Sequence, residues 1–215
     1  MLHPHVPEDL KHFGKHLFAT FLGLLMALGL ESWHQSHLHA EAARHSQAFI
    51  ARELEANRRE LERELDSVHK CLPALDRMRK SLEARLGDRR GPAQAFLSME
   101  DLRVSIATLR NASWEASVAT QSVAHMESWR VERIANTFAL QKDLEAIHAQ
   151  FLQRLFALVR QAENDRGGVL LAKLPAPQAR QMLGDLREAM VSLGVIRRSA
   201  QDLDKAMAGA LEACR

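Results

Sequence analysis

The chain has 215 residues, 47% of them hydrophobic, which is enough apolar material for a sizeable core. Its 29 lysines and arginines nearly balance 27 aspartates and glutamates, so the clear basic excess of a general nucleic-acid binder is missing. Tyrosine is absent, and only 10 glycines and 6 prolines are available for turns. This composition argues against a β-sandwich or barrel and favours an all-α fold.

The N-terminal part of the sequence has the pattern of a membrane anchor. A short polar, histidine-rich tail, residues 1–16, precedes the uncharged apolar run 17–30. We expect a transmembrane helix over residues 17–33, with Lys15 reaching the headgroups at one interface and Trp33 lying at the other. The run is apolar on all sides, which disfavours a buried helix of a soluble protein, and a cleaved signal peptide is the remaining alternative.

The charges around this run indicate its orientation. Lys11 and Lys15 lie immediately before it, whereas Arg44 and Arg52 lie farther beyond it. Because cytoplasmic flanks carry the excess of positive charge, we expect a cytoplasmic N-terminus. Residues 34–215 would then form a helical domain outside the inner membrane, in the periplasm of a Gram-negative cell.

A long helix is expected to continue directly from the anchor. Neither glycine nor proline occurs between Glu31 and Leu72, and Pro73 is expected to break or kink the helix. Asn57 falls near the apolar seam of this helix, where it either fixes the register or is solvated at the edge. The seam has the heptad spacing of a coiled coil: Leu54, Leu61, Val68, Leu75 and Leu82. It either packs in a core or serves homo-oligomerisation.

The rest of the chain predicts further helices after a loop at residues 87–92. Three long and two short helices joined by short loops predict an antiparallel helical bundle. The expected helices are one of about a dozen residues from Ser98 to near Asn111, one capped by Ser113 and ending near Ala124, and two long amphipathic ones over 127–164 and about 178–213.

One cluster of side chains has the spacing of a metal site. His34, His37, Glu41 and His45 are three or four residues apart and share one face of the expected helix. Imidazole and carboxylate groups in this arrangement can bind Zn or Cu, and neighbouring histidines can sense pH. A polar, interfacial helix face without either role is the third interpretation. Association of several copies around an axis would favour the metal.

Cys71 and Cys214 are the only cysteines, and no CxxC motif is present. A redox-catalytic pair or a zinc knuckle is therefore not expected. In an oxidising compartment one intramolecular disulfide can join Cys71 to Cys214. An intermolecular bridge and two free thiols are the alternatives.

Two tryptophans flank the short helices of the C-terminal half. Trp114 and Trp129 either line an apolar pocket for a small ligand or pack these helices onto the bundle, and we expect the second role. Glu115 and Glu127 are close in sequence to them and could act as paired carboxylates, although surface positions are the simpler expectation.

Several stretches resemble a group of bacterial proteins. The stretches are residues 25–33, 53–57, 112–120 and 126–141, the first of which ends in Glu31-Ser32-Trp33. Together they resemble uncharacterised bacterial single-pass membrane proteins with a short N-terminal anchor and a long helical extracytoplasmic domain. The resemblance implies a single-pass anchor and a helical domain, and it implies no known reaction.

The sequence contains no catalytic motif. There is no GxxxxGK[ST] phosphate loop, GxGxxG, HExxH or G-x-S-x-G. We therefore expect a non-catalytic, membrane-anchored interaction or scaffold protein without a cofactor. Its partners would be the lipid bilayer and a second copy or another membrane protein. An extracytoplasmic sensory or ligand-binding bundle that acts through a membrane partner is the alternative, and a hydrolase or metalloenzyme is the third hypothesis.

Overall fold

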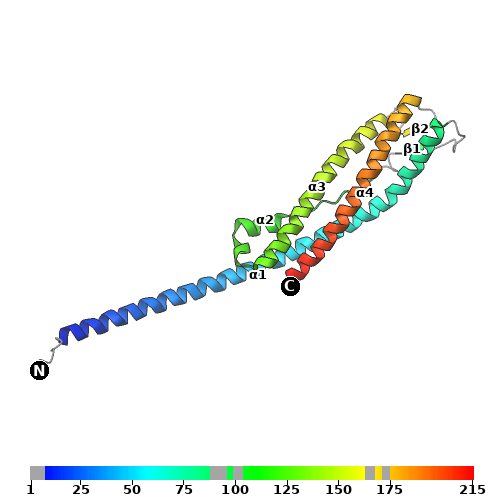
Figure 1. Ribbon diagram of the computed structural model, residues 1–215. Helices are drawn as coiled ribbons and strands as arrows, with labels where there is room; N and C mark the ends of the chain where they lie inside the picture. The colour runs from blue at the N-terminus through cyan, green and yellow to red at the C-terminus, as the bar shows by residue number, and fades with distance from the viewer. Residues whose placement is uncertain (1–7, 88–95, 99–103, 163–167, 171–174) are drawn as a thin grey trace, which may run out of the picture.

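The computed structural model describes residues 8–87, 96–98, 104–162, 168–170 and 175–215. Helices dominate these residues (Figure 1). The elements are α1 (Glu8–Leu86), β1 (Phe96–Ser98), α2 (Ala112–Ala119), the 3-10 helix η1 (Ser122–His125), α3 (Ser128–Ala162), β2 (Gly168–Leu170) and α4 (Ala176–Ala213). The expectations of an all-α fold and of a long N-terminal helix are confirmed.

The 79 residues of α1 form one helix, which is about 120 Å long at 1.5 Å per residue. Its N-terminal half extends away from the other helices, and its C-terminal half packs against them (Figure 1). The expected break at Pro73 is wrong, because the helix continues through this residue to Leu86. Pro73 is exposed, while Cys71 before it and Ala74 and Leu75 after it are buried. Packing on both sides of the proline compensates for the backbone hydrogen bond that its ring removes.

The core lies where α1, α3 and α4 meet. The whole heptad seam of α1, Leu54 to Leu82, is at most 2% exposed. The seam is therefore buried within the chain, and the alternative that it serves homo-oligomerisation does not fit this packing. The partners from the other helices include Ile134, Leu144 and Phe151 on α3 and Leu186, Leu193, Ile196, Leu203 and Met207 on α4.

Polar contacts between the long helices show the relative direction of each pair. Between α3 and α4, residues early in one helix contact residues late in the other: Arg130 with the Ala213 carbonyl, Thr137 with the Ala206 carbonyl and Arg154 with Ser192. Contacts between α1 and α4 follow the same reversed order, joining Arg58 to Asp204 and Glu83 to Arg187. Contacts between α1 and α3 follow parallel order, joining Asn57 to Gln141 and Glu64 to His148.

The described part of residues 98–111 does not form the expected helix. Ser98 ends β1, and residues 104–111 have no regular secondary structure; Asp101, the expected partner in the cap, lies outside the described residues. Residues 104–111 run beside α1 instead, and their backbone bonds to its side chains. Strand β1 pairs antiparallel with β2, with Leu97 opposite Val169.

Candidate functional sites

The N-terminal half of α1 exposes apolar side chains on all sides. Between Phe13 and Trp33 the large hydrophobic residues are 43–68% exposed, and no residue of the most apolar window is buried. Among the described residues, α1 is the one helix long and apolar enough to cross a membrane. Lys15 and Trp33, the predicted interface residues, are both exposed near the ends of this stretch.

The predicted metal ligands His34, His37, Glu41 and His45 lie along one exposed face of α1. His45 Nε2 lies 3.7 Å from Glu41 Oε1, and the His37 ring stacks on Trp33. No group of three or more histidine, cysteine or carboxylate side chains converges closely enough for a metal ion in the part of the chain that the structure describes. One copy of the chain therefore does not assemble these four residues into a metal centre.

His39 points away from this face and makes a contact that the sequence pattern did not predict. Its ring stacks on His125, at the end of η1, with ring centroids 4.0 Å apart and an angle of 15° between the planes. Close by, Ser46 and Ser122 share a hydrogen bond of 2.7 Å between their hydroxyl groups. These contacts hold η1 against α1 where the helix leaves the bundle (Figure 1).

The two cysteines lie at different levels of the bundle. Cys71 lies on α1 between Arg58 and Glu83, which pair with Asp204 and Arg187, whereas Cys214 follows the end of α4. In this register Cys214 lies more than about 20 Å from Cys71 along the bundle axis. An intramolecular disulfide therefore does not fit the fold, since its two Cα atoms would have to lie within about 7 Å. Burial raises the pKa of the Cys214 thiol, which Arg130 lowers in part, so this thiol stays protonated near neutral pH.

The two tryptophans have different roles. Trp114 packs against the core and stacks on Phe138, with ring centroids 5.7 Å apart, which agrees with the expected packing role. Trp129 is 50% exposed and donates its indole N–H to Glu127, so the expected packing role is wrong for this residue. The Arg130 and Arg133 guanidinium groups lie over its ring.

A groove of about 570 Å³ lies between α3 and α4 beside Trp129. Arg133 and Lys205 supply positive charge to it, Glu132 supplies negative charge, and it is open to solvent. Because Trp114 is stacked in the core and this groove is shallow, the described residues give no specific support to a ligand pocket at the tryptophans. Glu115 and Glu127 are both exposed, as expected for surface carboxylates.

A polar stripe on α1, which the sequence analysis missed, holds the returning chain. We define it as Ser46, Glu53, Asn57, Glu64 and Ser67, whose spacings of seven, four, seven and three place them on one face next to the leucine seam. Four of its side chains form hydrogen bonds, in order with Ser122, Ser113, Arg110 and Ser105, and the fourth member, Glu64, lies in ion-pair distance of His148. The residue numbers of the hydrogen-bonded partners fall from 122 to 105 as α1 runs from Ser46 to Ser67. The segment from Ser105 to Ser122 therefore runs antiparallel to this helix.

Asn57 is the best-connected member of the polar stripe. Its side chain is fully buried, accepts the Arg110 N–H at 2.9 Å and donates to the Arg110 carbonyl at 2.7 Å. Gln141 of α3 accepts a further bond from Asn57 and donates to the same carbonyl. The solvated interpretation of Asn57 is therefore wrong, and this amide ties α1, α3 and the returning segment together.

Glu53 and Glu64 place two carboxylates inside the fold. Glu53 accepts the Ser113 N–H at 3.0 Å, and this carboxylate replaces the side-chain cap that Asn111 does not provide to α2. Glu64 Oε1 lies 2.7 Å from His148 Nε2, with both side chains at most 6% exposed. The two groups are close, but among the described residues neither Glu64 oxygen nor this nitrogen has a well-aligned hydrogen-bond partner.

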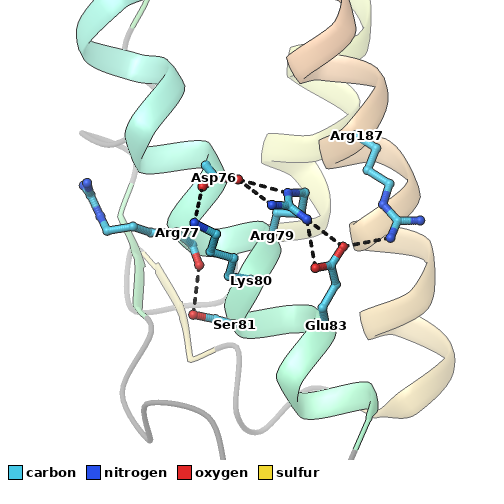
Figure 2. Close-up of polar contacts among 7 residues, drawn as sticks. All are labelled: Asp76, Arg77, Arg79, Lys80, Ser81, Glu83 and Arg187. Atoms are coloured by element: carbon cyan, nitrogen blue, oxygen red, sulfur yellow. Dashed lines mark hydrogen bonds and ion pairs between the residues drawn. The ribbon is translucent and has the colours of Figure 1, made fainter.

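A surface network of ion pairs joins α1 to α4 at the far end of the bundle (Figure 2). Arg79 contacts Asp76 at 2.6 Å and Glu83 at 2.8 Å, and Glu83 also accepts from Arg187 of α4 at 2.8 Å. Lys80 and then Arg79 lower the pKa of the Asp76 carboxyl below its ordinary range. Arg187 is the largest cause that lowers the pKa of Glu83.

Comparisons with protein-family models, curated proteins and solved structures found no match to this chain. The resemblance noted from the sequence therefore stays a prediction.

Proposed function

We propose that this protein is a membrane-anchored helical scaffold without catalytic activity of its own. Residues 17–33 of α1 cross the bilayer once, and residues 34–215 form an antiparallel-type bundle, with α4 reversed against α1 and α3, on the outer side of an inner membrane. The same helix that crosses the bilayer supplies the core seam, so the bundle is held rigidly at a fixed distance from the lipid. Its partners would be the bilayer and another membrane protein or a second copy.

The observation that carries this proposal is the complete exposure of the apolar half of α1. No residue of its most apolar window is buried, and Leu17, Phe18, Leu24 and Leu28 are each about 60% exposed. A continuous apolar surface of this kind is unstable in water and marks a site covered by lipid or protein. The length of the run and its flanking Lys15 and Trp33 favour lipid.

Substitution of one residue in the span tests the anchor. We expect the full-length protein to stay with membranes after alkaline extraction and to need detergent for solubilisation. Leu24→Arg should release a large part of it, because a charge at the centre of a short span costs about 2.5–3.5 kcal/mol. Leu38→Arg is the matched control, since Leu38 is an exposed leucine of the same helix beyond the span.

Two results would contradict the anchor: a full-length protein found in the aqueous fraction without detergent, or equal release by both arginine variants. The side of the membrane is tested separately by reporter fusions to the C-terminus. A reporter that is active only in the cytoplasm would overturn the proposed orientation while leaving the anchor intact.

A further inference from the structure

Two side chains of the predicted metal cluster lie close to the separation that a metal ion requires of its ligands. His45 Nε2 is 3.7 Å from Glu41 Oε1 across one helical turn, and both side chains are more than half exposed. A tetrahedral Zn²⁺ ion with bonds of about 2.0–2.2 Å holds neighbouring ligand atoms about 3.4 Å apart. A small rotation of either side chain therefore lets this pair chelate zinc through one nitrogen and one oxygen.

The other two members of the cluster do not complete the site within one chain. His34 lies seven residues before Glu41, which is about 10 Å along the helix axis. The His37 ring stacks on Trp33. In the described part of the chain no third histidine, cysteine or carboxylate joins the pair to form a metal site. One chain thus supplies two ligands, and a tetrahedral centre needs two more.

The pair lies on the side of α1 that faces away from the bundle. Ala43 is buried in the core, and at about 100° per residue Glu41 and His45 each lie about 160° around the helix from it, in opposite directions. A second α1 helix can therefore reach them without displacing the core. Arg44 flanks the pair, and its Nε donates to the Ala40 carbonyl of the same helix. Its charge opposes a cation, so binding has to come from the ligand bonds.

The proposed anchor would bring two such pairs together. Chains that cross one bilayer in the same direction have parallel α1 helices and present this side of the helix at the same height. Eighteen residues make five helical turns, so Gly23 lies in line with Glu41 and Ala27 in line with His45. Small residues four positions apart let two helices approach closely in lipid. The same side of α1 thus permits close approach within the bilayer and carries the ligands above it.

We propose that Glu41 and His45 from two copies of this chain form a zinc site just outside the membrane. Each copy supplies one imidazole nitrogen and one carboxylate oxygen, so Zn²⁺ gains four ligands, and the two carboxylates balance its charge. Zinc then links two anchored chains side by side. This inference rests on the proposed anchor, which sets the parallel orientation, and it makes a second copy a partner of the scaffold.

Isothermal titration calorimetry of the untagged full-length protein in detergent micelles tests the site, with zinc sulfate as the probe. We expect one zinc ion for two chains, and sedimentation of the same samples should show dimers that EDTA returns to monomers. Glu41→Gln and His45→Gln should each lower the zinc affinity by about tenfold or more, since residues that merely support a metal ligand already contribute this much.

His69→Gln is the matched control, because His69 is an exposed histidine of α1 within the bundle, and this variant should bind zinc as the parent does. All three substitutions are at exposed positions, so the helical circular dichroism should not change. A parent protein that binds no zinc, or equal binding by Glu41→Gln, His45→Gln and the parent, overturns the site. One zinc ion per chain without dimers overturns the assignment of the remaining ligands to a second copy.

The outcomes also separate the zinc site from the anchor. A chain that stays with membranes after alkaline extraction but shows no zinc-dependent dimer overturns the site and leaves the anchor standing. A chain that is released into the aqueous fraction but binds one zinc ion for two chains, with loss in both glutamine variants, overturns the anchor and supports the site.

Discussion

Asn57 shows how one buried side chain decides the path of a distant segment. Its amide group has both a donor and an acceptor, and both are used by the backbone of Arg110, 53 residues away. An apolar residue at this position would leave the Arg110 N–H without its partner in a partly buried environment. The returning segment therefore depends on a single amide more than on its own local preference.

We predict that Asn57→Ala lowers the free energy of unfolding by about 2–3 kcal/mol, because it removes three hydrogen bonds and strands a backbone donor. Chemical denaturation followed by circular dichroism measures the change. Asn136→Ala is the matched control at an exposed position of α3 and should change the stability by less than about 0.5 kcal/mol. Equal effects of the two variants would show that the amide bonds contribute nothing specific.

Glu64 and His148 form another buried polar contact, and its energetics differ from those of the Asn57 hydrogen bonds. Removing one partner leaves the other polar group buried and alone, so we predict that Glu64→Met or His148→Leu costs about 3–5 kcal/mol. The double variant replaces both groups by apolar ones and should recover most of this loss or exceed the parent stability. A double-mutant cycle measures the coupling, and additive effects of the two substitutions would contradict it.

These residue-scale features could be predicted from the sequence only in part. The polar stripe of α1 has a heptad-like spacing beside the leucine seam, and that signal was present in the sequence. Its partners were not, because Ser105, Arg110 and Ser113 are recognised largely through their backbone, which carries no residue-specific pattern. The stacking of His39 on His125 joins residues 86 positions apart in the sequence and has no local signature either.

At the scale of elements, periodicity predicted the long helices and failed for the short segments. The apolar stripes of α3 and α4 repeat over many turns, and the structure places their central members in the core. Residues 104–111 include only three strong helix formers, Ala107, Leu109 and Arg110, and they form no helix, because bonds to α1 and α3 outweigh this weak local propensity. Pro73 shows the converse, since a local helix breaker is overridden by packing on both sides of it.

The ion-pair network at the far end of α1 makes the stability depend on pH. The lowered pKa values of Asp76 and Glu83 mean that the unfolded chain takes up protons first as the pH falls. The contribution of these carboxylates is therefore complete above their ordinary values of 3.8 and 4.5, and it is lost as the pH falls through their lower values in the folded chain.

We predict that Arg79→Gln flattens this acid dependence, because Arg79 contacts both carboxylates. The measurement is the denaturation midpoint as a function of pH from 5 to 2. Arg180→Gln is the matched control, an exposed arginine on α4, and should keep the parent profile. Because all these groups are exposed, the difference should be small and should shrink further in high salt. A profile for Arg79→Gln identical to that of the parent would contradict the role of the network.

At the scale of the whole molecule, one continuous helix, α1, combines an exposed apolar half with a half that packs in the bundle. Its first buried residue in the described chain is Ala43, and the core residues follow from Ile50 onward. Residues before Ala43 add no buried side chain to the bundle, although His39 contacts η1 at the surface. The buried side chains of the described chain thus lie outside the apolar half of α1, and we expect the bundle to fold without that half.

We predict that a variant beginning at residue 34 is soluble without detergent, keeps its helical circular dichroism and unfolds cooperatively. Removing residues 1–33 deletes the exposed apolar surface and no buried side chain of the described chain, so the free energy of unfolding should stay within about 1 kcal/mol of the full-length value. Denaturation of both forms in the same detergent compares them directly.

A second truncation beginning at residue 51 is the informative contrast, because it removes Ala43 and Ile50 from the core and the Ser46 contact to Ser122. We expect that form to be clearly less stable. An unfolded or aggregated chain from residue 34 onward would contradict this prediction and would show that the bundle requires residues 1–33, together with the lipid or partner that covers their apolar surface.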